Sequence, residues 1–307
     1  LLAKWFGDTR WDADGKDPAV TDLNALGTRS LATPETGVTA VGHLTGSGKL
    51  TKSGASTLAL TDAQDYLGSL VLGGGGLKLE AAAIPSEPAT NAFFHVDASR
   101  TNSFVLDADG RVLSWQDWRG NGREAAVQSG FSTPALAAGA AGGKAAVDFG
   151  ALGSMQALQW NHTNDAIKAV FLVFQSLANT ASILGSVGAL QYQDFYRGAS
   201  GQLYHNDGTT ASRAVVYVAN YVNGWRVEPM VSTLPSGFCV ISVIPTTDAR
   251  ACAFAMNRTT TSQTGGQRLA EVIVYSRSLT DRERRDTEAY LMRKWIGRAA
   301  PGYGDGS

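Results

Sequence analysis

Seven aromatic and polar residues in the second half of the chain have the types and spacing that carbohydrate recognition uses. Sugar rings stack their C–H faces on aromatic rings, while carboxylates, amides and guanidinium groups hold their hydroxyls. The segment Gln191–Arg197 combines both kinds of side chain, and a hairpin and a turn further along the chain add more. The candidate ligand-binding residues are Tyr192, Asp194, Tyr196, Tyr204, Asn206, Asp207 and Trp225.

Alternation within Gln191–Arg197 decides which of these side chains act together. Successive residues of a strand point to opposite faces, so Tyr192, Asp194 and Tyr196 share one face. A face with two tyrosines and a carboxylate suits a glycan. The alternative is that the tyrosines line the rim of the core and that Asp194 solvates a turn. The sequence leaves both interpretations open.

The segment Trp115–Gly122 holds a second group of candidate residues. We expect Trp115 to point inward and Asp117 to accept hydrogen bonds from the loop 120–122. Asp117 and Asn121, together with nearby carbonyls, would also meet the preference of calcium for oxygen ligands. Calcium is therefore the one cofactor that we keep as an alternative.

The sequence gives little support to catalytic chemistry. Glycoside hydrolysis needs two carboxylates that face one cleft, often spaced Glu-x-Asp-x-Glu along a strand, and no such run occurs. Glu271 is the only acid in the last predicted strand, and Glu228 stands alone beside Pro229. A phosphate-binding loop, a Gly-x-Ser-x-Gly elbow and a His-Glu-x-x-His zinc motif are also missing. We therefore expect a protein that is not an enzyme, and keep a glycoside hydrolase with dispersed acids as the third alternative.

The composition narrows the range of partners. The 307 residues include 26 Lys and Arg against 27 Asp and Glu, a formal net charge of −1, without a block of basic residues. Nucleic acid and anionic membranes are therefore poor partners. The longest apolar runs fall well short of the roughly 18 residues of a membrane helix, so we expect no membrane insertion by this chain. Cys239 and Cys252 either bridge two antiparallel strands or stay separate core thiols.

The elements that must position these residues are short strands. The chain has 35 glycines and only 17% charged residues, a composition typical of strands and turns. Asp-Gly and Asn-Gly pairs separate apolar runs over 91–276, which predicts an all-β jelly-roll or β-sandwich. One helix is expected at Asp281–Trp295, between the capping box Thr280–Glu283 and Gly297. Its core-facing residues are Thr287, Leu291 and Trp295.

A different pattern occupies residues 37–80, where short strands alternate with glycine corners as in the coils of a β-solenoid. The strands expected here are Lys49–Lys52, Thr57–Leu60, Ser69–Leu72 and Leu77–Leu79. A solenoid coil buries its apolar face only against a neighbour, and normally about three coils are needed. A single coil must therefore pack on the following domain, on coils outside this sequence or on another molecule.

This pattern resembles the autotransporter-associated β-strand repeat. That repeat combines a Gly-Ser-Gly turn, a Leu-Thr-Lys-x-Gly strand, a Thr-Leu-x-Leu strand, a Tyr-x-Gly turn and a closing Gly-x-Leu-x-Leu strand. The matching residues are Gly46–Gly48, Leu50–Gly54, Thr57–Leu60, Tyr66–Gly68 and Gly76–Leu79. The chain departs from the repeat at Ala63–Asp65, where an Asn-rich turn is usual, and the pattern occurs once. The resemblance implies one β-solenoid coil.

Residues 91–297 resemble the concanavalin A-like, laminin G-like lectin/glucanase sandwiches. The opening motif is Phe94–Ser99 followed by Gly110–Ala125, and the closing motif is Leu269–Arg284 with Tyr290–Trp295. The resemblance implies a β-sandwich but no single function. Such sandwiches serve as carbohydrate-binding modules, adhesin domains, structural parts of cell and phage surfaces, and occasionally enzymes.

Together these patterns divide the chain into an irregular segment, a β-solenoid-like repeat, a linker, a sandwich and a flexible tail. Their bounds are 1–36, 37–80, 81–90, 91–298 and 299–307. We expect a non-catalytic, secreted or cell-surface module for adhesion or assembly, whose partner is a glycan or a neighbouring surface protein. The alternative is a structural subunit that associates through its solenoid segment into a homo-oligomer, a filament or a surface layer.

Overall fold

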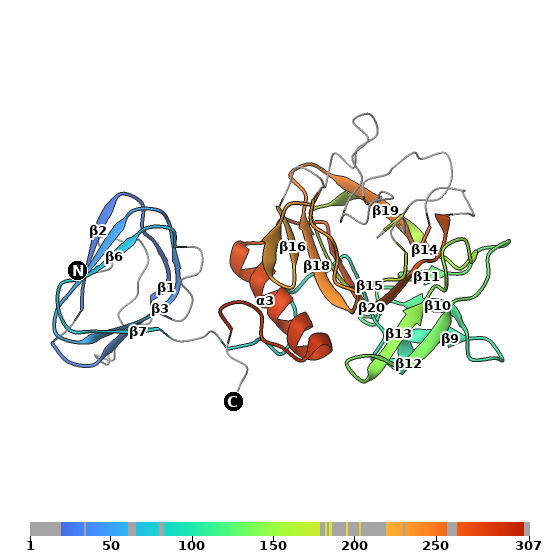
Figure 1. Ribbon diagram of the computed structural model, residues 1–307, viewed down its shortest axis with the longest axis horizontal. Coiled ribbons are helices and arrows are strands. Elements are labelled where there is room, and N and C mark those ends of the chain that lie inside the picture. Colours follow the sequence, from blue (N-terminus) through green and yellow to red (C-terminus); the bar gives the residue numbers. More distant parts are fainter. Residues whose placement is uncertain are drawn as a thin grey trace. The chain divides into compact units, whose positions relative to one another are not determined.

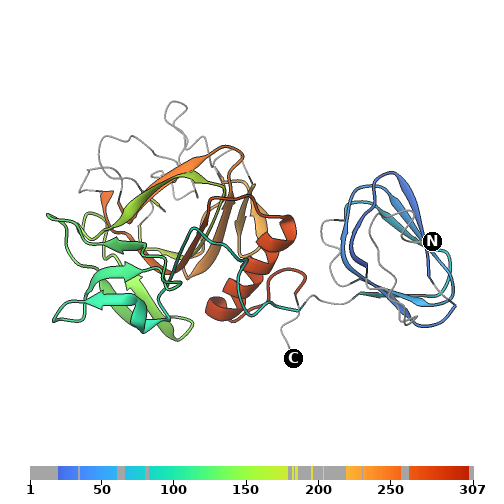
Figure 2. The same ribbon diagram turned by 180° about the vertical axis from the view of Figure 1, so that it is seen from behind.

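The chain divides into two compact units, each built mainly of strands. The computed structural model describes residues 20–33, 35–60, 66–79, 83–178, 182, 184–185, 195, 203, 219–229, 231–256 and 263–303. One unit comprises Leu1–Ile84 with Gly302–Ser307, and the other comprises Pro85–Pro301. Within the described residues the only α-helix lies near the C-terminus (Figures 1 and 2). The predicted all-β class with one C-terminal helix is confirmed.

The first unit is a stack of parallel coils. One sheet contains β1 (Val20–Asn24), β3 (Val38–Thr45), β5 (Thr57–Leu60) and β7 (Gly76–Leu79), in that order. The facing sheet contains β2 (Thr28–Ala32), β4 (Lys49–Ser53) and β6 (Ser69–Leu72). Every pair is parallel and in register, so Leu50 pairs with Arg29 of the preceding coil and with Leu70 of the next. Each coil therefore has the same backbone course as the one before it. The edge strands of one coil form hydrogen bonds with the equivalent strands of the next.

The stack is longer than the sequence predicts. The strands expected within 37–80 are present, but β1 and β2 lie inside the segment 1–36 that we expected to be irregular, so that expectation was wrong from Val20 to Ala32. Few residues of these two strands are apolar, so their sequences show no alternation that would indicate a strand. Parallel hydrogen bonding to the following coil defines them instead.

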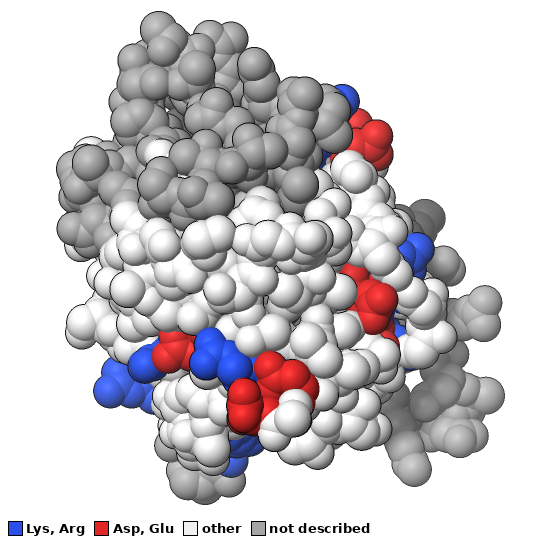
Figure 3. All heavy atoms as spheres, turned by 90° about the vertical axis from the view of Figure 1, so that its right-hand side faces the viewer, with Lys and Arg blue, Asp and Glu red and all other residues white. Residues whose placement is uncertain are grey.

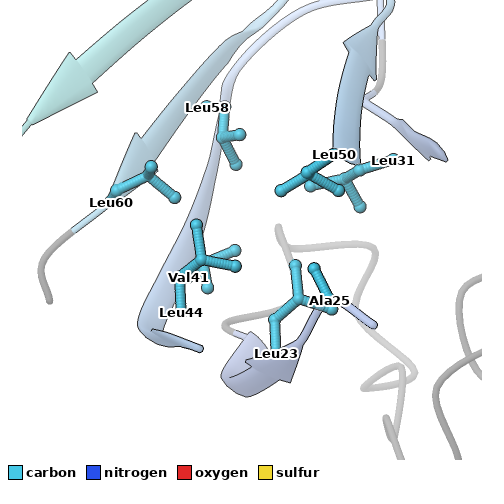
Figure 4. Close-up of a cluster of buried hydrophobic side chains, with 8 residues drawn as sticks. All are labelled: Leu23, Ala25, Leu31, Val41, Leu44, Leu50, Leu58 and Leu60. Atoms are coloured by element: carbon cyan, nitrogen blue, oxygen red, sulfur yellow. The ribbon is translucent and has the colours of Figure 1, made fainter. Parts of the chain in front are cut away.

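The core of the stack lies between its two sheets. Eight buried apolar side chains from five strands and one corner project into it, as Figure 4 shows. They are Leu23, Ala25, Leu31, Val41, Leu44, Leu50, Leu58 and Leu60. Tyr66 and Leu70 pack against this cluster from the last coil and are only partly buried.

Two polar side chains join successive coils. Lys52 is fully buried, and its ammonium group donates to the carbonyls of Gly54 (2.7 Å), Ser56 (2.5 Å) and Gly74 (2.7 Å). All three of its protons are therefore used. The Tyr66 hydroxyl bridges coils in the same way, since it donates to the Gly48 carbonyl at 2.8 Å and accepts from the Leu50 N–H at 3.0 Å.

Glycine is required at one corner because the coils approach closely there. A Cβ on Gly48 would collide with the carbonyl of Gly27 in the preceding coil, and a Cβ on Gly68 would collide with the carbonyl of Gly48. The ring of Tyr66 also lies against Gly68. The Gly-Ser-Gly and Tyr-x-Gly turns read from the sequence therefore have one steric cause.

The second unit is a sandwich of two antiparallel sheets. The larger sheet has the order β12 (Ala135–Ala141), β13 (Lys144–Asp148), β20 (Gln267–Tyr275), β15 (Ala169–Ser176), β18 (Cys239–Ile244), β16 (Ala219–Val222) and β17 (Trp225–Val227). In addition, β8 (Phe94–Asp97) pairs with β20. The smaller sheet has the order β19 (Ala249–Phe254), β14 (Leu158–Ile167), β11 (Glu124–Ala126), β10 (Val112–Gln116) and β9 (Phe104–Leu106), the last preceded by the short 3-10 helix η1 (Thr101–Ser103).

Aromatic rings fill the space between these sheets. Phe94 from the larger sheet lies 5.1 Å from Trp160 and 6.1 Å from Phe254 of the smaller sheet, measured between ring centroids. Trp115 is fully buried and lies 5.9 Å from Phe254. The inward position predicted for Trp115 is confirmed.

The C-terminal helix covers the outer face of the larger sheet. α3 (Asp281–Leu291) packs on β15 and β18 and continues into the π-helical turn η3 (Met292–Ile296). The predicted capping box between Thr280 and Glu283 is present, and Gly297 ends the helix in the left-handed conformation with φ of 69°. The predicted core-facing residues Thr287, Leu291 and Trp295 are buried.

The chain on either side of the sandwich is more firmly held than expected. From Pro85 onward the predicted linker belongs to the second unit, where Ala89 donates its N–H to Thr287 (3.1 Å) and accepts from the Tyr275 hydroxyl (2.6 Å). In the predicted flexible tail, Ala300 and Tyr303 are buried. The two prolines of the segment 81–90 led us to predict a linker. Proline lacks an N–H for a hydrogen bond, but its ring can still be buried, as at Pro88.

Cys239 and Cys252 are buried thiols that lie on different sheets, at β18 and β19. These two strands do not pair with each other, because the chain passes from one sheet to the other in this stretch. The alternative of two separate core thiols is the one that the structure adopts.

We predict that Lys52→Met opens the coil stack. The substitution keeps the length of the side chain but leaves three carbonyls without a donor, at a cost of about 3 kcal/mol. Hydrogen exchange measured by mass spectrometry should show faster exchange in β4 and β5. Lys49→Met, on the exposed face of the same strand, is the control and should exchange like the parent. Equal protection in both variants would contradict the role assigned to Lys52.

Candidate functional site

Six of the seven predicted ligand-binding residues lie outside the described residues. They are Tyr192, Asp194, Tyr196, Tyr204, Asn206 and Asp207. Two apolar neighbours in the same stretches are described, and Phe195 and Leu203 are both buried. The glycan face expected over Gln191–Arg197 stays a prediction.

Trp225, the seventh residue, is exposed at the end of a rigid hairpin. The turn between β16 and β17 places Asn223 and Gly224 at positive φ (52° and 77°), the geometry that an Asn-Gly pair favours. Asn223 is fixed to β18, because its N–H donates to the Val240 carbonyl (2.8 Å) and its Oδ1 accepts from the Val240 N–H (2.9 Å). Trp225 is 68% exposed, so an anchored turn presents a free aromatic face.

Asp117 has the structural role expected from the sequence. Its Oδ1 accepts from the Arg119 N–H (2.8 Å), and its Oδ2 accepts from the His95 N–H (2.9 Å) and the Asn121 amide nitrogen (2.8 Å). The amide oxygen of Asn121 accepts from the Arg123 N–H at 3.0 Å. The two side chains thus meet as donor and acceptor rather than as two oxygen ligands.

Metal-ligating side chains are dispersed in the described part of the chain. There, no three His, Cys, Asp or Glu side chains are grouped closely enough to hold a metal ion. Asp117 and Asn121 would need to rearrange their hydrogen bonds to bind calcium. The calcium alternative therefore stays a prediction without geometric support.

A polar cluster that the sequence analysis missed lies between the larger sheet and the C-terminal helix. Asp97 of β8 pairs directly with Glu271 of β20, so two buried carboxylates lie side by side. Lys294 of η3 joins them, since its ammonium group donates to Asp97 Oδ2 at 2.6 Å and to Glu271 Oε2 at 2.7 Å. It also donates to the Tyr290 hydroxyl at 2.9 Å.

The Glu271 carboxylate is surrounded by donors. The Trp295 indole N–H donates to its Oε2 at 2.6 Å, and the Tyr290 hydroxyl donates to its Oε1 at 3.4 Å. His95 Nε2 lies 2.6 Å from the same Oε1. Glu271 is fully buried and every one of its contacts comes from another element, so this carboxylate holds β8 and the helix on the sheet.

Asp97 is bound with equal completeness. Its Oδ1 accepts from the N–H (2.9 Å) and the hydroxyl (2.7 Å) of Ser99, and Arg100 Nε lies 3.1 Å from its Oδ2. Burial raises the pKa of Asp97, but the charge of Lys294 and the hydrogen bonds from Lys294 and Ser99 outweigh it, so the pKa is below 3.8. Burial, followed by the charges of Glu271 and Asp97, raises the pKa of Tyr290.

This cluster forms one wall of a pocket in the second unit. The pocket has a volume of about 510 Å³ and is bounded by the chain after Ile84, the end of β8 and the last turns of the helix. Its lining residues are Pro85, Ser86, Glu87, Asp97, Ser99, Arg100, Tyr290, Arg293 and Lys294. Glu271 lies behind this wall, so only one of the two acids borders the pocket.

Figure 3 shows how charge is distributed on one face of the molecule. On the face drawn in Figure 3 most of the described surface is uncharged, and the few basic and acidic side chains lie beside one another. The described residues also contain no helix that is long and apolar enough to cross a membrane.

Comparison with protein-family models, curated proteins and solved structures finds no match for this chain. Its function must therefore be inferred from its own residues.

We predict that Lys294→Met destabilises the second unit and makes it acid-sensitive. Removing one partner of a buried ion pair costs about 3–5 kcal/mol. Because burial then acts on Asp97 without the lysine, its pKa rises. In the parent, the stability that Asp97 contributes is complete above pH 3.8 and is lost as pH falls towards its lower folded pKa. The variant should lose that stability at a higher pH.

Tryptophan fluorescence during urea and acid titrations measures both effects. The control is Lys168→Met, which breaks an exposed ion pair with Asp248 and should cost less than about 1 kcal/mol. An acid transition at the same pH in Lys294→Met and the parent would refute the role of this lysine.

Proposed function

We propose that this chain is a non-catalytic module of an extracellular or cell-surface protein, and that its coil stack attaches it to another coil stack. The observation that carries the proposal is the exposure of the last coil. Leu58 and Leu60 in β5 are 0% and 3% exposed, whereas their register partners in β7, Leu77 and Leu79, are 38% and 72% exposed. The two leucine positions are therefore buried in β5 and exposed in β7.

The edge of the stack supports the same proposal. Within the described residues β7 pairs only with β5, and β6 pairs only with β4, so their outer backbone groups lie at sheet edges. Leu67 and Leu72 beside these strands are also exposed. Open, apolar edge strands are templates for further strands.

A second copy of the chain is the partner that fits this edge. Each coil pairs with the next in parallel and in register, so a complementary partner must follow the same path with the same glycine corners. A second coil stack has that path by construction. The resemblance to a repeat that normally occurs in series supports the same conclusion.

The non-catalytic part of the proposal is supported by the paired acids. In the described part of the chain, Asp97 and Glu271 are adjacent carboxylates, yet both are ion-paired with Lys294 and hydrogen-bonded, and Glu271 does not border the pocket. Glycoside hydrolysis needs one acid that can lose a proton and one that can attack or activate water. This pair offers neither.

Leu79→Asp should weaken self-association. Burying one leucine is worth about 2 kcal/mol, and a charge in its place adds a desolvation cost, so the dissociation constant should rise at least about tenfold. Light scattering coupled to size exclusion, over a range of protein concentrations, measures the mass. Val231→Asp, at a 71% exposed valine of the second unit, is the control and should associate like the parent. A parent that stays monomeric at every soluble concentration would overturn the proposal.

Glycan contact through Trp225 is a second candidate function, favoured by the exposure of this side chain on its anchored hairpin. An aromatic face in this position is suited to stacking on a sugar ring. We expect Trp225→Ala to weaken glycan binding about tenfold, and Trp225→Phe to retain most of it. A glycan array followed by calorimetry tests this. If the alanine variant binds the same glycans with the same affinity as the parent, Trp225 is not part of a glycan site.

A further inference from the structure

The pocket beside Asp97 is lined by hydrogen-bonding groups and by apolar surface in similar measure. Its volume of about 510 Å³ lies within the range of small-molecule sites, which run from about 300 to 1,000 Å³. Pro85, the Tyr290 ring and the stems of the basic side chains supply the apolar part, and the ends of the charged side chains and the serines supply the polar part. A ligand that fits this lining must therefore combine apolar C–H surface with several hydroxyls or charges.

Arg100 is held in a fixed orientation at the pocket. Its Nε lies 3.1 Å from Asp97 Oδ2, and its guanidinium carbon lies 3.7 Å from the centre of the Trp118 ring. In the part of the chain that the structure describes, Nε is the only guanidinium nitrogen of Arg100 with a hydrogen-bond partner. The two terminal nitrogens are thus left as a fork, the geometry that binds a carboxylate through two parallel hydrogen bonds.

The charges around the fork favour a carboxylate-bearing ligand. Asp97 forms ion pairs with both Lys294 and Arg100, which reduces its repulsion of an anion beside Arg100. Arg293 adds a second guanidinium to the lining, while Glu87 on the opposite segment is an acceptor for hydroxyl groups. Ser86 and Ser99 add two small polar side chains.

We infer that this pocket binds an acidic saccharide, with the sugar carboxylate on the Arg100 fork and the sugar hydroxyls on Glu87 and the serines. A polyol with one carboxylate matches the mixture of one preorganised guanidinium and several neutral or accepting groups. A bare inorganic anion would leave the acceptors unused. The site uses neither the coil stack nor Trp225, so it stands or falls independently of both candidate functions.

Calorimetry on the full chain with a glucuronate-containing disaccharide tests the site. The acidic disaccharide should bind at least tenfold more tightly than a neutral disaccharide of the same size. Arg100→Gln should weaken its binding about tenfold or more, because a charge-assisted pair is lost. Arg282→Gln, at an exposed arginine of α3 that does not line the pocket, is the control and should bind like the parent.

A second variant keeps the test decisive if Arg100→Gln is poorly folded. Glu87 is exposed and makes no hydrogen bond within the described residues, so Glu87→Gln should fold normally. It should bind the acidic disaccharide a few-fold more tightly, since a repelling charge is removed, whereas the neutral disaccharide should bind no more tightly than to the parent. Leu79→Asp should retain binding, which separates this site from self-association. Equal affinity for the two disaccharides, or sulfate binding as tightly as the acidic disaccharide, would overturn the inference.

Discussion

The buried charge of Glu271 is the constraint around which the second unit is organised. A carboxylate without solvent is tolerated only when donors surround it. Those donors are His95 at the start of the unit and Tyr290, Lys294 and Trp295 at its end. Lys294 and Trp295 are consecutive residues that would point about 100° apart in a regular α-helix. In the wider π-helical turn of η3, the side chains of Lys294 and Trp295 both donate to Oε2 of Glu271.

Features that depend on a few neighbouring residues could be predicted from the sequence. Features that depend on residues far apart in the chain could not. The capping box at Thr280 and the Asn223–Gly224 turn act within a few residues, and both formed as expected. The sequence analysis did not predict β1 and β12. β1 has few apolar residues and β12 is rich in alanine, so each is defined as a strand by its hydrogen bonds to a neighbouring strand. The pairing of Asp97 with Glu271 joins residues from opposite ends of the sandwich, so neither acid indicates the other in the sequence.

The coil stack obeys a different rule from the sandwich. The two antiparallel sheets of the sandwich bury each other's apolar faces, with aromatic rings packed between them, as around Phe94. Parallel coils gain stability only by adding an equivalent neighbour, and the terminal coil always lacks one. The exposed leucines of β7 are the direct result of that rule. One chain therefore combines a self-contained unit with an open-ended one.

The carbonyl cage of Lys52 makes this residue a chemical reporter on the stack. An amine reacts with acylating reagents only through a free lone pair, and the folded stack keeps this amine sealed from solvent with each proton donated. The exposed Lys49, three residues earlier on the same strand, has no such shelter. The ratio of labelling at these two lysines would therefore measure how often the coils separate, in the intact chain and without any substitution.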